Sequence, residues 1–169
     1  MRLQFATRMR EPFSMSARKQ NQNAPGEAAP KEAEPKKKIL VVDDDPVTVK
    51  ALTLALTSKG YAVSSACDGS EAIGVVRDDT PDMLLVDVNL EPQDAFGGAA
   101  LFDGFQVTRW LRNVTAKNIP AIIISATDKA DYRRYAAKIG AETFLAKPIS
   151  NATLLQAIEA GLAGQSARI

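Results

Sequence analysis

The sequence predicts an α/β fold in which five strands and five helices alternate to form a doubly wound parallel sheet. Two observations carry this prediction. Short apolar runs alternate with longer segments in which apolar side chains recur at helical spacing. Of the 169 residues, 46% are hydrophobic and 24% are charged, which is ordinary for a globular protein with a core. Strands that are apolar on both faces need helices on both faces of the sheet. The alternation of strands and helices implies that the strands are parallel and that their crossovers are right-handed.

The five strands are predicted from apolar runs over residues 39–42, 61–66, 83–86, 121–124 and 143–146. The five helices are predicted over residues 47–59, from 68 onward, and over 104–113, 128–139 and 150–162. Five βα units therefore occupy about 125 residues of the chain.

Each helix has its own signals. Asp68 and Glu71 have the spacing of a capping box, and Ser150 is a typical N-cap. Gly60 and Gly140 end two of the helices. The inward-facing side chains are expected at Leu52, Ala55 and Leu56; Ile73 and Val76; Val107, Trp110 and Leu111; Tyr132, Tyr135, Ala136 and Ile139; and Leu154, Leu155, Ile158 and Leu162.

Missing residue types exclude several kinds of chemistry. The chain has no histidine, which rules out Ser–His and Cys–His nucleophiles, a histidine-bound zinc or haem, and a phosphohistidine. Cys67 is the single cysteine, so an intrachain disulfide is impossible; we expect this side chain to be inert and half-buried. No apolar run approaches the length of a membrane span, and we expect a cytoplasmic protein with no membrane contact.

Charge and composition divide the chain near residue 38. Residues 1–38 carry a net charge of +5, and residues 39–169 carry −4. Residues 1–37 are predicted to be a disordered basic extension rich in Pro, Ala, Glu and Lys, because they cannot bury enough apolar surface to offset the entropy of ordering them. The folded domain is expected over 38–163, with a C-terminal tail over 164–169. Its negative charge argues against DNA binding by the domain itself.

Polar residues gather at the predicted strand ends. Asp43 and Asp44 follow the first strand, Asp87 the third, Ser125 the fourth and Lys147 the fifth. In a parallel sheet these ends share one edge, where ligands bind. Clustered carboxylates need neutralisation, and Lys147 together with a hard cation such as Mg²⁺ would supply it. A carboxylate beside a metal ion and a lysine is a candidate nucleophile toward a phosphoryl group.

Together these motifs resemble the receiver domain of two-component response regulators. The resemblance rests on the apolar run 39–42 with the acidic residues after it, on Asp87, on Ser125-Ala126 and on Lys147-Pro148, and it covers about residues 38–163. It implies a flavodoxin-like (βα)5 sheet of strand order 2-1-3-4-5. It also implies a single-domain, chemotaxis-type regulator that is not an enzyme, since no output domain follows residue 162.

The resemblance implies a role for each matching residue. Asp87 would be the phosphoacceptor, and Lys147 would hold the phosphoryl oxygens. Mg²⁺, or Mn²⁺ in its place, would be bound by Asp44 and Asp87 directly, by Asp43 through water, and by the backbone carbonyl of Asn89. Ser125 and Phe144 would act as the conformational switch, with Phe144 turning inward, while Asn89 and Thr127 would tune the lifetime of the phosphoryl group.

The resemblance also implies partners. The phosphoryl group would come from a histidine kinase or a phosphotransfer protein. The signal would pass to a downstream protein through the face made by residues 128–139, 143–146 and 150–162, or phosphate would pass onward in a relay. The protein would be a monomer or a weak dimer through that face.

Two features near the site remain open. The loop 91–102 is longer than is usual in the family, and we expect either a partner-contacting or site-covering role or a tolerated insertion. Glu91 or Asp94 in this loop would then be further candidate metal ligands. Asp45, which precedes Pro46, is interpreted as a helix cap rather than a metal ligand.

Two other functions compete with the phosphorylated receiver. The first is a receiver-shaped interaction module that is never phosphorylated. The second is a haloacid-dehalogenase-type phosphatase with Asp43 as its nucleophile, because residues 43–47 also fit that Asp-x-Asp-x-Val motif. The phosphatase would lack the late acidic pair of its family, since no acid follows Lys147 before Glu159. Phosphorylation of Asp87 would indicate a receiver, and phosphorylation of Asp43 would indicate the phosphatase.

Overall fold

The computed structural model describes residues 35–90, 104–115 and 118–166. The expected disorder of the N-terminal extension and the expected loop at 91–102 therefore fall wholly or largely outside the described residues. Within them the elements alternate in chain order: β1 (Lys38–Val42), α1 (Pro46–Thr57), β2 (Ala62–Ala66), α2 (Gly69–Asp78), β3 (Met83–Asp87), α3 (Gly104–Val114), β4 (Ala121–Ser125), α4 (Ala130–Lys138), β5 (Thr143–Ala146) and α5 (Asn151–Ser166).

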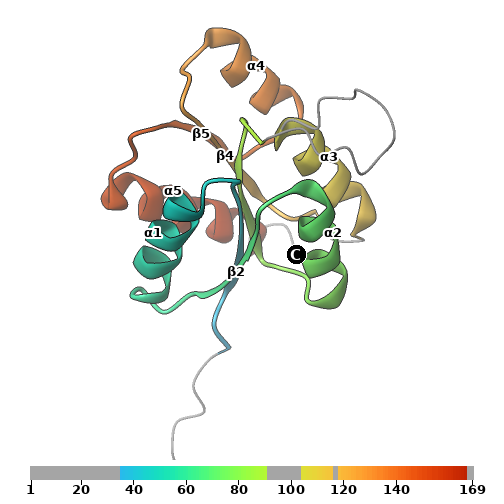
Figure 1. The fold of residues 1–169 in the computed structure, drawn as a ribbon, viewed down its shortest axis with the longest axis vertical. Helices are drawn as coiled ribbons and strands as arrows, with labels where there is room; N and C mark the ends of the chain where they lie inside the picture. The colour runs from blue at the N-terminus through green and yellow to red at the C-terminus, as the bar shows by residue number, and fades with distance from the viewer. Residues whose placement is uncertain (1–34, 91–103, 116–117, 167–169) are drawn as a thin grey trace, which may run out of the picture. The chain divides into compact units, whose positions relative to one another are not determined.

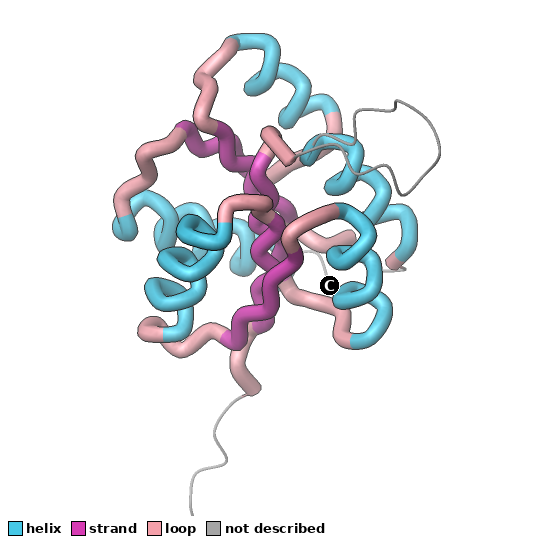
Figure 2. Tube along the Cα trace, viewed as in Figure 1, coloured by secondary structure: helices cyan, strands magenta, loops and turns pink. Residues whose placement is uncertain are grey.

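The strands form one parallel sheet in the order β2-β1-β3-β4-β5. This confirms the predicted fold class and strand order. The register places Val42 opposite Ala66 and Val86. It places Asp87 opposite Ile124 on the next strand. The carboxyl ends of β1, β3 and β4 therefore share one edge, from which the chain enters the helices that flank the sheet (Figures 1 and 2).

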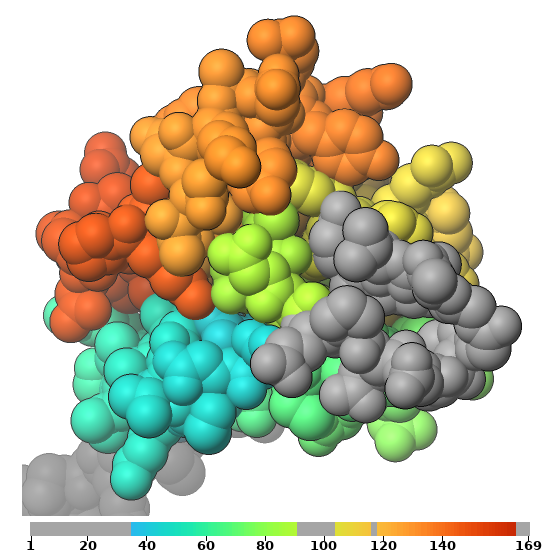
Figure 3. All heavy atoms as spheres, turned by 45° about the horizontal axis from the view of Figure 1, so that its top comes forward, coloured from blue at the N-terminus to red at the C-terminus, as the bar shows by residue number. Residues whose placement is uncertain are grey.

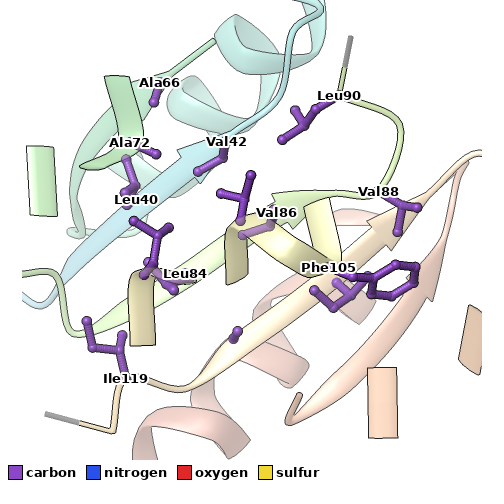
Figure 4. Packing of buried hydrophobic residues seen from close by; sticks show 14 of the residues in the cluster. Leu40, Val42, Ala66, Ala72, Leu84, Val86, Val88, Leu90, Phe105 and Ile119 are labelled. Carbon is purple, nitrogen blue, oxygen red and sulfur yellow. The ribbon is translucent and has the colours of Figure 1, made fainter. Parts of the chain in front are cut away.

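Successive strand residues pack into different cores. In β1, Leu40 and Val42 join one cluster, while Ile39 and Val41 join the other. The first cluster lies under α2, α3 and α4, and Figure 4 shows part of it. The second lies under α1 and α5. This strict alternation is the reason why the strands read as continuous apolar runs.

The predicted caps are present. Asp45 accepts hydrogen bonds from the amides of Val47 at 3.0 Å and Thr48 at 3.2 Å, which confirms that it caps α1. Ser150 Oγ accepts from the Thr153 amide at 3.1 Å at the start of α5. Gly60 and Gly140 adopt φ of +92° and +74°, a region that favours glycine, where their helices end.

The Asp68–Glu71 capping box differs by one residue from its usual form. Asp68 Oδ1 accepts from the Glu71 amide at 2.8 Å, as predicted. Glu71 Oε2 accepts from the amide of Cys67 at 2.8 Å rather than from that of Asp68. Cys67 is exposed, so the expectation that it is half-buried was wrong.

Helix boundaries and faces show further differences from the prediction. α4 begins at Ala130, two residues later than predicted, because Asp128 pairs with Arg133 instead of opening the helix. Tyr135 was predicted to face inward, yet it is 40% exposed. α5 continues to Ser166, three residues beyond the expected end of the domain.

Within the described ranges, no helix combines the length and apolar character needed to cross a membrane.

Candidate functional site

The predicted site residues meet at the carboxyl edge of the sheet. β1 leads into Asp43 and Asp44, β3 ends at Asp87 and β5 is followed by Lys147. Figure 3 looks onto this edge and shows the segments after β1 (cyan), β3 (yellow-green) and β5 (orange to red) beside one another. Four crossovers, through α1, α2, α3 and α4, thus bring together residues that are far apart in sequence.

Three carboxylates form a compact cluster. One oxygen from each of Asp43, Asp44 and Asp87 lies within 4.8 Å of the other two. Asp43 is 2% exposed and Asp87 6% exposed, while Asp44 is half-buried. Buried carboxylates at this spacing repel one another unless cations neutralise them.

Lys147 supplies one compensating charge. Its Nζ donates to Asp43 Oδ2 at 2.8 Å and to Asp87 Oδ2 at 3.2 Å. The backbone holds the side chain in place, because the Lys147 amide donates to the carbonyl of Ser125 at 2.8 Å. Burial acts to lower the pKa of Lys147, but the hydrogen bond to Asp43 and the charge of Asp87 outweigh it and raise that pKa. The ammonium is therefore charged at neutral pH.

Asp87 has one oxygen engaged and one oxygen unused. Oδ2 accepts from Lys147, whereas Oδ1 is buried and has no hydrogen-bond partner among the described residues. Burial raises the pKa of Asp87, and Lys147 offsets this effect only in part. A buried carboxylate oxygen without a partner is costly and calls for an explanation at the site itself.

The cluster fits a hard divalent cation. Three clustered carboxyl groups face a single ammonium, and oxygen is the ligand that Mg²⁺ and Mn²⁺ prefer. Asp45 is not available for this purpose, because its carboxylate caps α1. Its amide donates to Asp43 Oδ1 at 2.9 Å and so orients that carboxylate.

The remaining predicted residues lie in β4, in β5 and in the segments that follow β3 and β4. Ser125 is fully buried at the end of β4, and its Oγ accepts from the amide of Thr127 at 3.0 Å. Asn89 lies two residues beyond Asp87, with an exposed side chain. Phe144, in β5, is only 8% exposed, and the Arg133 guanidinium lies 5.0 Å from its ring centroid. The ring is therefore largely buried, and its inward turn on phosphorylation stays a prediction.

Gly104 is a site residue whose role sequence reasoning missed. A Cβ added to it would lie 1.8 Å from the carbonyl oxygen of Asp87. Its amide donates to the carbonyl of Val88 at 3.0 Å, so the start of α3 is joined to the end of β3. The Asp-Gly pair at 103–104 indicated the start of a helix, but only the backbone approach explains why the residue must be glycine.

A pocket of about 340 Å³ adjoins the cluster beside Asp43 and Asp44. Lys50, Cys67 and Glu71 also line it. The Cys67 thiol is held protonated there, because hydrogen bonding to Glu71 and burial raise its pKa to about 11.

Residues 39–159 match the family described as the response regulator receiver domain. This chain belongs to that family. The match spans most of the domain and contains the ends of β1, β3 and β5, which supply the three carboxylates and Lys147. Membership confirms the resemblance drawn from the sequence, and proteins of this family are generally signalling modules rather than enzymes.

Several characterised relatives share the receiver sequence. The protein PilH of Pseudomonas aeruginosa is 33% identical over 128 residues, which are 75% of this chain and 98% of PilH. The response regulator PleD of Caulobacter vibrioides is 37% identical over 118 residues, which are 69% of this chain but 24% of PleD. The response regulator MprA of Mycobacterium avium is 35% identical over 123 residues, covering 73% of this chain and 50% of MprA.

Solved structures share the receiver fold. A CheY-like receiver protein from Methanospirillum hungatei superposes with a TM-score of 0.69 at 20% identity and covers 80% of this chain and 100% of its own. A response regulator from Burkholderia pseudomallei, crystallised with a phosphorylated aspartic acid, a calcium ion and citrate, gives a TM-score of 0.64 at 23% identity over 79% of this chain and 72% of its own.

Proposed function

We propose that this receiver accepts a phosphoryl group on Asp87 from a histidine kinase or a histidine phosphotransfer protein. The observation that carries the proposal is the unequal state of the two Asp87 oxygens. Lys147 holds Oδ2 at 3.2 Å, which orients the carboxylate, while Oδ1 is buried and has no partner among the described residues. An oriented carboxylate with one oxygen left unused is arranged for attack on phosphorus.

The phosphoryl transfer needs no reactant besides Asp87 and the phosphohistidine donor. An oxygen of Asp87 forms a bond to the phosphorus of a phosphohistidine, and the phosphorus–nitrogen bond breaks. The electron pair of that bond stays on the imidazole nitrogen of the donor, which takes up a proton. Lys147 then lies between Asp43 and the newly formed acyl phosphate. Its ammonium binds a phosphoryl oxygen and stabilises the negative charge there.

Asp43, Asp44, Asp87 and the backbone carbonyl of Asn89 would hold a Mg²⁺ ion, or Mn²⁺ in its place. The carboxylate oxygens within 4.8 Å of one another support this assignment. When bound there, such an ion would supply positive charge to phosphoryl oxygens. The Burkholderia pseudomallei structure, with its phosphorylated aspartic acid and calcium ion, is a precedent on the same fold.

The signal would leave through α4, β5 and α5, toward a downstream protein or a relay partner. Ser125 would turn its hydroxyl toward the phosphoryl group, which breaks the bond from the Thr127 amide at 3.0 Å and moves the β4–α4 turn. Phe144, which has the Arg133 guanidinium against its ring, would turn further inward as the second switch residue. Thr127 and Asn89 would tune how long the phosphoryl group lasts. We place the protein in the cytoplasm as a monomer or weak dimer that binds no DNA through this domain.

Intact mass spectrometry tests the proposal. The full chain is incubated with acetyl phosphate or phosphoramidate, with Mg²⁺ or with EDTA, beside Asp87→Asn and Asp43→Asn variants. We expect a gain of one phosphoryl group that requires Mg²⁺ and is lost in Asp87→Asn. Thermal melting of the variants in EDTA shows that each remains folded.

Three other outcomes would overturn the proposal. A gain that persists in Asp87→Asn and disappears in Asp43→Asn would point to the phosphatase-type nucleophile. A gain without any divalent cation would reject the metal assignment. No gain with either donor, in folded protein with Mg²⁺, would favour an interaction module that is not phosphorylated.

A further inference from the structure

A second pocket lies between α3 and α4, apart from the acidic cluster. Its volume is about 410 Å³, within the range of small-molecule sites. Its described lining consists of Arg109, Arg112, Asn113, Tyr135, Lys138 and Ile139. None of these residues belongs to the phosphorylation site, so the proposed function leaves the pocket unexplained.

The lining has a charge opposite to that of the domain. Residues 39–169 carry a net charge of −4, yet three of the six described lining residues are cations and none is acidic. Arg109 and Lys138 are exposed, so their charged groups are within reach of a ligand in solution. Cations converging from two helices on one concave surface favour an anionic ligand.

The Arg112 side chain is held in the pocket lining by two hydrogen bonds to backbone carbonyls. Its Nε donates to the carbonyl of Ile119 at 2.9 Å, and its Nη1 donates to the carbonyl of Ile139 at 2.7 Å. The Ile139 carbonyl lies at the C-terminal end of α4 and the Ile119 carbonyl lies shortly before β4, so these bonds satisfy two carbonyls that would otherwise repel an anion. The guanidinium is thus held in place before any ligand arrives.

Tyr135 adds an aromatic wall. Its side chain is 40% exposed, one of the few large apolar side chains in the described part of the chain that reach the surface. The ring is held edge-on against Phe105, with centroids 5.0 Å apart and planes at 70°. A fixed, exposed ring beside cations suits a ligand that carries both an aromatic group and negative charge.

We propose that this pocket binds a nucleotide. Arg109 and Lys138 hold the phosphates, and the ring of Tyr135 packs on the base. The side-chain amide of Asn113, which both donates and accepts hydrogen bonds, lies in the same lining and meets the base edge. A bare phosphate would use the cations alone and would leave the aromatic wall without a role.

Calorimetric titration of the full chain in EDTA tests the proposal. The chelator keeps metal-mediated binding away from the aspartate cluster. The ligands are ATP, GTP and, as the arm without a base, inorganic pyrophosphate. We expect saturable nucleotide binding below about 1 mM that weakens steeply as salt rises, with pyrophosphate at least about tenfold weaker than the better nucleotide.

The variants separate the pocket from general surface charge. Arg109→Ala and Lys138→Ala are each expected to weaken binding about tenfold. Arg134→Ala is the matched control, because Arg134 is an arginine of α4, is 79% exposed and does not line the pocket. Tyr135→Leu is expected to weaken nucleotide binding and to leave pyrophosphate binding unchanged. Arg112 is left intact, since its loss would disturb the backbone bonds.

Four outcomes would overturn the proposal. They are no saturable binding of either nucleotide, equal loss in Arg134→Ala and Arg109→Ala, equal affinity for pyrophosphate and nucleotide, and unchanged nucleotide binding in Tyr135→Leu. The test uses no phosphodonor and no Mg²⁺, so its result is independent of the proposed phosphorylation.

Discussion

The Lys147 ammonium lies 2.8 Å from Asp43 Oδ2, closer than its 3.2 Å separation from Asp87 Oδ2. One cation therefore serves two buried carboxylates, and Asp43 has the shorter contact. Asp87 is left with a buried, unpartnered Oδ1 and a pKa raised by burial. The site thus concentrates its electrostatic cost on the residue proposed to react.

Because the buried carboxylate of Asp87 destabilises the folded protein, a neutral substitution at this position should stabilise it. Its folded-state pKa lies above the ordinary 3.8, so the native protein holds this proton more tightly than the unfolded chain. The contribution of Asp87 to stability therefore falls as pH rises through that raised pKa, and it is unfavourable at neutral pH. We expect Asp87→Asn to raise the free energy of unfolding at pH 7 in EDTA, measured by urea denaturation.

The gain should shrink as the pH falls through the raised pKa of Asp87, because the wild-type carboxyl then becomes protonated. Asp79→Asn is the control, because Asp79 is a carboxylate whose side chain is 64% exposed. A variant that is less stable than wild type at pH 7 would contradict the assignment of Asp87 as a strained carboxylate.

Gly104→Ala is expected to destabilise the receiver by about 1–3 kcal/mol, since the new methyl group forces the backbone apart. The added Cβ would lie 1.8 Å from the Asp87 carbonyl oxygen, so β3 and α3 must separate. The same shift should slow phosphorylation by acetyl phosphate. Urea denaturation and the intact-mass assay measure the two effects.

Gly74→Ala is the matched control for this substitution. Gly74 lies inside α2, and a Cβ there would meet nothing within 4 Å. Because alanine is the better helix former, this variant should be more stable by about 0.5–1 kcal/mol. Equal effects of the two substitutions would show that the close approach at Asp87 is not tight.

Arg112→Met is expected to cost about 1–3 kcal/mol of stability, because the carbonyls of Ile119 and Ile139 lose their hydrogen bonds. Arg109→Met, on the same helix, should change stability by less than about 0.5 kcal/mol, as for a surface position. Thermal or urea denaturation of the pair measures the difference. If both variants have wild-type stability, the Arg112 bonds are not structural.

Cys67 should react slowly with alkylating agents despite its exposure. Hydrogen bonding to Glu71 and burial raise its pKa to about 11, and since only the thiolate reacts, the raised pKa lowers the reactive fraction at pH 8.5. The rate with iodoacetamide should rise with pH up to that pKa. Glu71→Gln removes the neighbouring charge and should make alkylation severalfold faster.

A small thiol such as glutathione, measured under the same conditions, gives the reference rate. Cys67 alkylation as fast as this reference at pH 8.5 would contradict the raised pKa. The result also bears on the pocket beside Asp43 and Asp44, because Cys67 and Glu71 line it.

The sequence alone predicted the order of elements and the composition of the site. The apolar run before Asp43, the cap formed by Asp45 and the glycine stop at Gly140 are local features, readable from neighbouring residues. Because parallel strands bring their carboxyl ends to one edge, placing Asp43, Asp87 and Lys147 at strand ends was enough to predict that they meet.

Side-chain pairing required the tertiary structure. Asp43 and Lys147 are 104 residues apart in sequence, and no local pattern tells which carboxylate the ammonium contacts more closely. Periodicity placed Tyr135 inward, but its ring packs against Phe105 at the edge of the core and stays 40% exposed. How deeply a side chain at the edge of the core is buried depends on which other elements pack against it. The spacing of apolar residues along one helix does not show which elements these are.

The sequence therefore determined which chemical groups reach the carboxyl edge, because the α/β alternation fixes where each strand ends. The tertiary structure alone decided that Asp87 Oδ1 has no partner among the described residues, that Gly104 touches the Asp87 backbone, and that Arg112 joins α3 to the end of α4. The physical reason is distance: hydrogen bonds and steric contacts act over a few ångströms between segments that the chain brings together only when the sheet has formed.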